Sequence, residues 1–143
     1  MITQCEAIEN LLGLDLTHGS RLDFADAVEK GLPTSALERL ASAMAPGKSS
    51  FKFRFVPKAT LERRKRTTGK LLSREESNRI ARVAKVFAFA EEIYGTRSDA
   101  GAFLMRPHIM LDGKKPLDVA LATDPGAEVV TNILGRIACS AAV

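Results

Sequence analysis

Side chains that commonly perform catalysis or bind metals are few and scattered in this sequence of 143 residues. The histidines His18 and His108 stand alone, neither at a metal-ligand spacing from a second ligand, so each is better explained as a loop or core residue than as a general base. Cys5 and Cys139 lie near opposite ends with no CxxC pair, which predicts two reduced thiols instead of a disulfide framework or a zinc site. No P-loop, GxGxxG or GxSxG motif is present. We therefore expect neither an enzyme nor a protein that holds a cofactor or a metal.

Three aspartates, Asp112, Asp118 and Asp124, recur at intervals of six residues, a pattern that would suit a metal site if the carboxylates met. Asp112 precedes a glycine in a turn signal, and Asp124 precedes a proline that opens a helical segment. Turn and capping roles therefore explain two of the three without an ion.

Binding of a polyanion is the chemistry that the charge distribution favours. Residues 48–85 contain 13 Lys and Arg but only 3 Asp and Glu, a local net charge of +10, whereas the rest of the chain has 8 basic and 14 acidic residues. A charge run often forms only a solvated surface, but so large a local excess with few compensating acids favours nucleic acid as the partner.

Length and composition limit the remaining classes. A chain of 143 residues with 45% hydrophobic residues corresponds to about one domain, or to two compact subdomains that share one chain. The apolar runs are too short for a transmembrane helix, and residues 1–10 lack the basic start of a signal peptide. We expect a cytoplasmic protein with no membrane partner.

Hydrophobic periodicity and turn residues predict short helices in the first part of the chain. Residues 5–12 form the first, residues 21–30 the second with Leu22, Ala25 and Val28 as its apolar face, and the third begins near Pro33. The third buries one stripe, made of Leu37, Leu40 and Met44, and stops at Pro46.

Residues 51–55 alternate apolar and basic side chains and permit two interpretations. The alternation and the aromatic content predict an edge strand with Phe51, Phe53 and Phe55 facing inward. Alternatively, a short helix capped by Ser49 or Ser50 would place Phe51 and Phe55 on one face, and the surrounding helices favour this second interpretation.

The next helix, residues 58–66, is strongly basic and has Leu61 as its main apolar anchor. A short helix pair whose second member presents basic and hydroxyl side chains is typical of a helix-turn-helix, in which phosphate contacts fix the register and a few residues reach base edges. The expected DNA contacts are Lys58, Thr60, Arg63, Arg64, Lys65 and Arg66.

A long helix is expected to link two halves of the molecule. Ser73 and Glu76 form a capping box, and apolar residues continue at helical spacing as far as Tyr94, before Gly95. Beyond it, Ser98 is expected to cap a helix that ends near Arg106. Pro116 opens another helix, and Asp124 caps a last one whose apolar residues are Val129, Val130, Ile133, Leu134 and Ile137. The sequence thus predicts an all-α protein.

Several ordered motifs resemble one known family. They are Gly31-Leu32-Pro33, residues 56–65, residues 72–79, Ala100-Gly101-Ala102-Phe103-Leu104, residues 111–118, residues 126–130 and Leu134-Gly135-Arg136-Ile137. From about residue 30 onward, the chain resembles the Xre-like antitoxins of the RES/Xre (MbcA/ParS/Xre) toxin-antitoxin systems. Many relatives have tryptophan where this chain has Phe103.

The resemblance implies an Xre-like helix-turn-helix region at 1–70, a linking and dimerisation helix at 71–95 and a small helical toxin-binding domain at 96–143. It further implies a homodimer that represses its own operon by binding promoter DNA and neutralises a co-encoded RES toxin that degrades NAD. The family's carboxy-terminal segment lies against the toxin's active-site cleft. Carried over, this assigns toxin binding to Phe103, Leu104, Arg136, Ile137, Cys139, Ser140, Ala141, Ala142 and Val143.

The residues by themselves leave another class open, a stand-alone helix-turn-helix regulator whose carboxy-terminal half only dimerises or binds a small ligand. A non-specific nucleic-acid binder is a third and weaker alternative, which a steep salt dependence without sequence preference would reveal.

Overall fold

The computed structural model describes residues 4–15, 20–67 and 69–141. In these ranges the chain forms α-helices and two short 3₁₀ helices but no strand. One isolated β-bridge joins Pro33 and Leu71. The elements in order are α1 (Gln4–Leu12), α2 (Arg21–Lys30), α3 (Thr34–Met44), η1 (Phe51–Arg54), α4 (Lys58–Arg66), α5 (Arg74–Tyr94), α6 (Arg97–Met105), η2 (Ile109–Leu111), α7 (Pro116–Ala122) and α8 (Asp124–Ala141). The predicted all-α class is confirmed.

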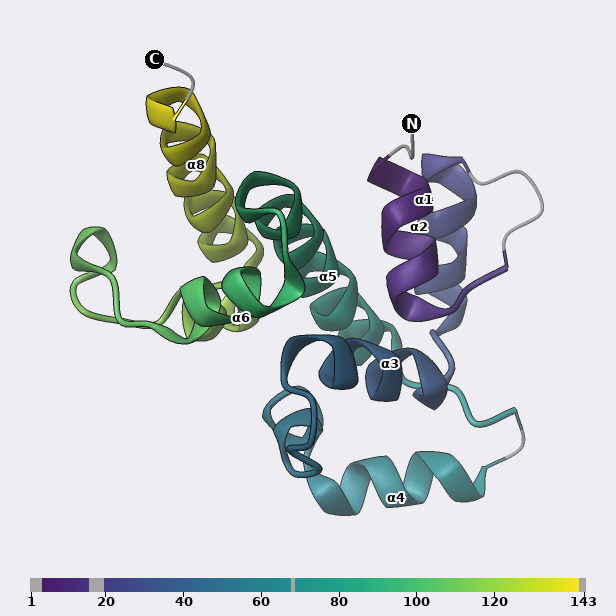
Figure 1. The fold of residues 1–143 in the computed structure, drawn as a ribbon. Helices are drawn as coiled ribbons and strands as arrows, with labels where there is room; N and C mark the ends of the chain where they lie inside the picture. Colours follow the sequence, from purple (N-terminus) through teal and green to yellow (C-terminus); the bar gives the residue numbers. More distant parts are fainter. Residues whose placement is uncertain (1–3, 16–19, 68, 142–143) are drawn as a thin grey trace.

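The long helix α5 is the axis of the molecule. Both halves of the capping box predicted at its start are formed, since Ser73 Oγ accepts from the Glu76 amide and the Glu76 carboxylate accepts from the Ser73 amide. Gly95 ends the helix in the left-handed conformation. Helices α1, α2 and α3 of the amino-terminal half pack against α5. Helices α6, α7 and α8 of the carboxy-terminal half also pack against it (Figure 1), so α5 supports both halves.

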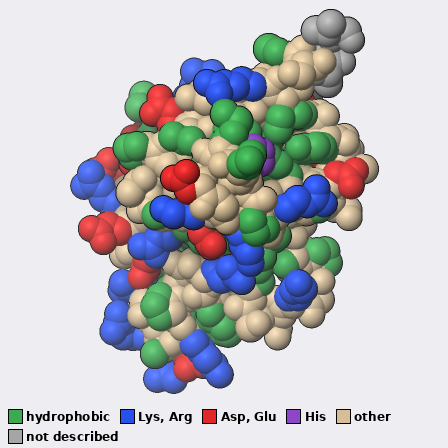
Figure 2. Space-filling model, turned by 90° about the vertical axis from the view of Figure 1, so that its left-hand side faces the viewer, with side chains coloured by type: hydrophobic (Ala, Val, Ile, Leu, Met, Phe, Trp, Pro, Cys, Tyr) green, Lys and Arg blue, Asp and Glu red, His purple; other side chains and the backbone are tan. Residues whose placement is uncertain are grey.

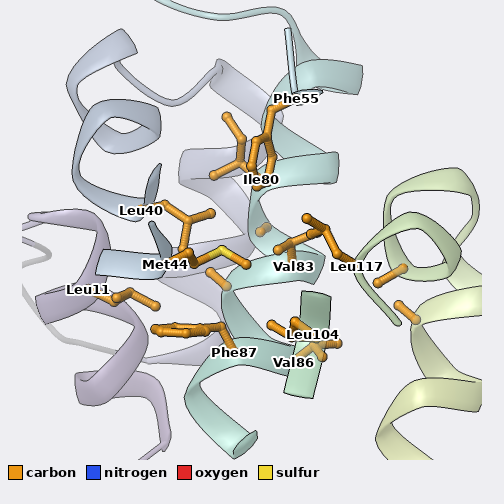
Figure 3. Close-up of a cluster of buried hydrophobic side chains, with 14 of the residues drawn as sticks. Leu11, Leu40, Met44, Phe55, Ile80, Val83, Val86, Phe87, Leu104 and Leu117 are labelled. Carbon is orange, nitrogen blue, oxygen red and sulfur yellow. The ribbon is translucent and has the colours of Figure 1, made fainter. Parts of the chain in front are cut away.

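A continuous hydrophobic core runs along α5. Figure 3 shows side chains from α1, α3, α6 and α7 converging on this helix together with Phe55. The labelled members are Leu11, Leu40, Met44, Phe55, Ile80, Val83, Val86, Phe87, Leu104 and Leu117. The predicted stripe of α3 is confirmed, because Leu37, Leu40 and Met44 are all buried. One shared core holds the amino-terminal and carboxy-terminal helices together.

Residues 51–54 form a 3₁₀ helix, so the strand interpretation of this segment is wrong and the helical one is confirmed. The expected cap is not, because Ser50 occupies the N-cap position without a capping hydrogen bond from its side chain. Among the described residues no strand lies beside this segment to pair with it, and a helical turn still buries the aromatic rings. Phe51 and Phe55 are both buried, with their ring centroids 5.9 Å apart and their planes at 65°. The two rings fix the turn that leads into α4.

The apolar face expected for α2 is wrong at two of its three positions. Leu22 is 70% exposed and Ala25 is also exposed, whereas Phe24 is buried and Val28 partly buried. Helix α2 contacts α5 through the side that carries Phe24, so this aromatic ring and not the leucine sets the rotation of the helix.

A glycine makes the close approach between the end of α2 and the start of α5 possible. Gly31 has φ of +106°, and a Cβ there would lie 2.4 Å from the Leu72 carbonyl oxygen. Beside it, the Leu32 amide donates to the buried Ser77 Oγ at 2.7 Å, and the Leu72 amide donates to the Leu32 carbonyl at 2.8 Å. These contacts anchor the start of α3 to α5.

The caps of α6 and α8 differ from the predicted ones. Thr96, not Ser98, caps α6 by accepting from the Asp99 amide, and Thr123, not Asp124, accepts from the Gly126 amide at the start of α8. In both cases a threonine that precedes the expected residue already has the extended backbone of an N-cap.

The predicted apolar face of α8 is correct except at one position. Val130, Ile133 and Leu134 are buried against α5 and α7 and Ile137 is half-buried, but Val129 is exposed and Ala127 takes its place in the core.

No helix within the described ranges combines the length and the apolar character that crossing a membrane requires.

Candidate functional site

The predicted recognition helix is formed as α4 and is attached to the core mainly by the buried side chain of Leu61. Most of its remaining surface faces solvent. Figure 2 shows Lys and Arg side chains gathered at the lower end of the molecule, where α4 lies in Figure 1. The basic surface expected from the sequence therefore exists, but its cations are not equivalent.

Lys65 is paired with a carboxylate on α3. Its Nζ lies 2.7 Å from Glu38 Oε1, and Lys52 Nζ of η1 lies 3.0 Å from the same oxygen. Partial burial alone would raise the pKa of Glu38, but hydrogen bonds from Lys65 and Lys52 outweigh it and hold this pKa below its usual value. Glu38 thus ties α4 and η1 to α3.

Arg64 is paired with a carboxylate on α5. Its Nε donates to Glu76 Oε1 at 3.1 Å, and the same carboxylate accepts from the Ser73 amide at 2.8 Å. Burial would raise the pKa of Glu76, but the hydrogen bonds from the Ser73 backbone and from Arg64 lower it overall. Glu76 therefore caps α5 and fixes α4 with one side chain.

The other expected DNA-binding cations of α4 remain outward-facing. Lys58, Arg63 and Arg66 are exposed and have no ion pair within the described ranges, while Thr60 is half-buried. Three cations of the predicted set are thus without an ion pair within the described ranges, and two, Arg64 and Lys65, hold the helix in place.

Two arginines that contribute to the positive charge of residues 48–85 are structural. Arg79 donates to the Phe55 carbonyl, and Arg82 donates to the Ala120 carbonyl at 2.7 Å and to Asp124 Oδ1 at 3.3 Å. The net charge of residues 48–85 does not reveal these structural roles. A signal was available, because both arginines adjoin the apolar positions Ile80 and Val83 in the middle of the long helix.

Of the two expected toxin contacts on α6, only one has exposed surface. Leu104 is 0% exposed and belongs to the core, so its assignment as a direct contact is not compatible with the structure. Phe103 retains 8% exposure, with its ring centroid 5.7 Å from that of Tyr94 and 6.1 Å from that of His108. Helix α6 packs against α5, α3 and α7, and it approaches α3 so closely that a Cβ on Gly101 would lie 2.9 Å from the Met44 carbonyl oxygen.

The last turns of α8 carry five of the remaining expected toxin contacts, Arg136, Ile137, Cys139, Ser140 and Ala141. Arg136, Cys139 and Ser140 are exposed and Ile137 is half-buried, all on a helix that continues to Ala141. Ile137 lines a hollow of about 280 Å³ together with Tyr94, Phe103 and His108. Ala142 and Val143 lie outside the described residues.

A larger groove of about 1200 Å³, which no sequence pattern indicates, runs between α2, α5 and α8. Charged side chains that line the groove form ion pairs with each other, since Arg74 pairs with Glu29 at 3.5 Å and Arg82 with Asp124 at 3.3 Å. The residues that line the groove consequently present little excess charge of one sign to a ligand.

The isolated histidines and aspartates do not combine into a site. His108 Nδ1 accepts a hydrogen bond from the Met110 amide at 3.1 Å, and Asp112 occupies a turn with the left-handed backbone conformation. Asp118 Oδ1 lies 3.7 Å from Arg54 Nη1, as in an exposed ion pair. No group of three His, Cys, Asp or Glu side chains suited to a metal ion occurs in the part of the chain that the structure describes. His18 lies outside that part.

Comparison with known proteins assigns a family to both halves of this fold. Residues 23–85 match the antitoxin Xre-like helix-turn-helix domain, and residues 89–138 match the antitoxin Xre/MbcA/ParS C-terminal toxin-binding domain. The fold and these two matches define an antitoxin that joins a helix-turn-helix to a toxin-binding domain. The chain belongs to the Xre-type antitoxin family. A curated relative, the antitoxin Xre of Yersinia enterocolitica (serotype O:8 / biotype 1B), is 26% identical over 136 residues, which span 94% of this chain and 90% of that protein.

Proposed function

We propose that this antitoxin binds and neutralises a co-encoded RES toxin that degrades NAD, and that as a homodimer it represses its own operon by binding promoter DNA in the cytoplasm. In this proposal it has no catalytic activity of its own and needs no cofactor. The observation that carries the proposal is that two different surfaces lie on helices that share one continuous hydrophobic core. The outward cations of α4 lie within residues 23–85, which match the helix-turn-helix domain. Most of α8 lies within residues 89–138, which match the toxin-binding domain, and the exposed end of this helix directly follows that match.

The end of α8 suits an inhibitory contact on physical grounds. Residues 137–143 contain no charged side chain, so a partner can cover them without removing a charge from water. In this proposal residues 136–143 cover the toxin's active site, and Phe103 contributes through the hollow that it lines together with Ile137.

The deciding experiment is co-expression of this chain with the product of the neighbouring open reading frame. We expect that product alone to deplete cellular NAD, and we expect the two proteins to co-purify as an inactive complex. If nothing co-purifies and NAD never falls, the chain is a stand-alone helix-turn-helix regulator. That second candidate is favoured only by the basic surface of α4, which it shares with the first.

Dimerisation and operator binding need their own measurements. Light scattering of the purified chain gives its mass in solution, and titration of a promoter fragment against a scrambled fragment at fixed salt gives the specificity ratio. A monomer, or equal affinity for the two fragments, would contradict this part of the proposal.

A further inference from the structure

The segment between α6 and α7 carries the most exposed large apolar side chain of the described residues. Ile109 is 89% exposed and its neighbour Met110 is 54% exposed. Figure 1 shows this segment, which we call the 106–115 loop, extending away from the helices of the body. Two adjacent apolar side chains held in water on a projecting loop are costly unless a partner covers them.

The 106–115 loop is closed by its own backbone hydrogen bonds. The His108 amide donates to the Lys114 carbonyl and the Gly113 amide to the His108 carbonyl, both at 3.0 Å. His108 Nδ1 also accepts from the Met110 amide at 3.1 Å, and Leu111 is buried as the anchor of the loop. Ile109 and Met110 are consequently presented in a fixed geometry, which lowers the entropy cost of docking.

Positive charge surrounds this apolar tip. Arg106 and Lys114 are exposed and Lys115 is half-buried, against a single acid, Asp112, within the loop. Figure 2 looks onto the face from which the loop projects and shows exposed hydrophobic side chains with Lys, Arg and some Asp and Glu among them. The matching surface on a partner is an apolar socket with an acidic rim.

The loop is also continuous with the surface to which toxin binding is assigned. It lies within residues 89–138, the span of the toxin-binding domain match, and His108 joins Phe103 and Ile137 in lining the hollow beside α8. A partner that covers the end of α8 therefore meets the loop across this hollow.

We propose that the 106–115 loop is a second docking element for the toxin, with Ile109 and Met110 inserting into an apolar socket rimmed by acidic residues. This inference rests on the proposed function. It assigns recognition to the loop, distinct from the coverage of the active site that is assigned to the end of α8.

The test uses the full chain carrying Ile109→Asp, with Leu22→Asp as the matched control. Leu22 is also a large exposed apolar residue, but it lies on α2, outside the toxin-binding domain match. Because both side chains are in solvent, neither substitution disturbs the core, and circular dichroism and Tm check this. We expect Ile109→Asp to weaken binding to the product of the neighbouring reading frame by about tenfold or more, as burial of a hot-spot residue implies, and Leu22→Asp to leave it unchanged.

A charge variant provides an independent measurement. Lys114→Glu should slow association with the same product and reduce the salt dependence of the association rate. Lys30→Glu should do neither, because Lys30 is exposed at the end of α2, beside the start of α5, whereas the loop follows the helix after the other end of α5. Together with the loss in Ile109→Asp, this result supports the acidic rim.

Each other outcome overturns the inference. Wild-type affinity in Ile109→Asp, or equal losses in Ile109→Asp and Leu22→Asp, would exclude the loop as the docking element. If Ile109→Asp instead changes the oligomeric state of the free chain and spares toxin binding, the loop contacts a second copy. Absence of any binding by the wild-type chain would refute the proposed function itself, which separates that failure from failure of the loop assignment.

Discussion

At the scale of single residues, the structure divides the basic residues of the sequence into two kinds. Arg64 and Lys65 point toward carboxylates on α5 and α3, whereas Arg63 and Arg66, on the same helix, face solvent. A cation that is already in an ion pair contributes less free energy to phosphate binding, because the existing ion pair must first be broken. The identity of a residue therefore says less about DNA binding than its rotational position on α4.

The double variant Arg63→Ala/Arg66→Ala should weaken binding to a promoter fragment and flatten the dependence of log K on log salt by ~0.9 for each phosphate that the variant no longer neutralises. The variant Arg64→Ala/Lys65→Ala, with the same change of charge, should flatten it less but lower the free energy of unfolding, because two ties to the body are removed. DNA titrations at several salt concentrations and urea unfolding measure both quantities. Identical salt slopes in the two double variants would contradict this division.

The carboxylate of Glu38 makes the free energy of unfolding depend on pH in the acidic range. Its pKa is lowered in the folded protein from an ordinary value of 4.5, so its stabilising contribution is complete above that value and is lost as the pH falls below it. Glu38→Gln should consequently show a shallower loss of stability below about pH 4.5 than the wild type. Urea unfolding between pH 3 and pH 7 is the measurement, with Glu62→Gln on the exposed side of α4 as the control. A wild-type pH profile in Glu38→Gln would show that the pair with Lys65 and Lys52 contributes nothing.

At the scale of elements, α4 is held to the body at a small number of positions. Leu61 is its buried residue, and the two carboxylates on α3 and α5 supply further ties. The helix is therefore sensitive to the removal of any one of them, unlike α5, which buries side chains along most of its length.

Leu61→Ala should lower the free energy of unfolding by about 2–5 kcal/mol, the usual cost of a large cavity in a core. Because α4 depends on this side chain, DNA affinity should fall as well, while binding to the toxin should persist at temperatures where the variant stays folded. Chemical unfolding and the two binding assays, made on the same preparation, decide this. Loss of toxin binding alone would contradict the assignment of α4 to DNA.

Helix α8 permits the reciprocal experiment. A chain that stops after Arg136 retains the buried Ile133 and Leu134, so the helix keeps its main anchors and the fold should survive. We expect protection against the toxin to be lost and DNA affinity to stay within about twofold of the full chain, as for a change at a distant, independent site. If the shortened chain still protects cells, residues 137–143 are not the inhibitory contact.

At the scale of the whole molecule, the two family matches meet inside α5, between residues 85 and 89, and the core does not stop there. Arg82 ties α5 to the end of α7, and Gly101 lets α6 approach the end of α3. The helix-turn-helix half and the toxin-binding half are therefore parts of one packed body, and the proposed division at residues 70 and 95 stays a prediction about function.

A single core predicts a single unfolding transition. Scanning calorimetry of the full chain should give a calorimetric enthalpy close to the van't Hoff enthalpy, and Ile80→Ala in the middle of α5 should shift the whole transition to lower temperature. Two resolved transitions, or loss of only one half in the variant, would show that the halves fold independently.

The sequence by itself determined the elements whose causes are local. The capping box at Ser73, the glycines at the ends of α2 and α5, and the helical spacing of apolar residues placed α2 at residues 21–30 and α5 near its observed bounds.

Tertiary structure decided what depends on partners distant in sequence. Whether Phe51 belonged to a strand or a helix depended on whether another strand lay beside it to pair with, and the buried side of α2 depended on which face met α5. Leu104 became core because α6 packs against α5, α3 and α7, and Arg64 became a tie because the Glu76 carboxylate lies within hydrogen-bonding distance of it. Local propensity acts within a few residues, but burial and ion pairing are set by contacts that only the folded chain brings together.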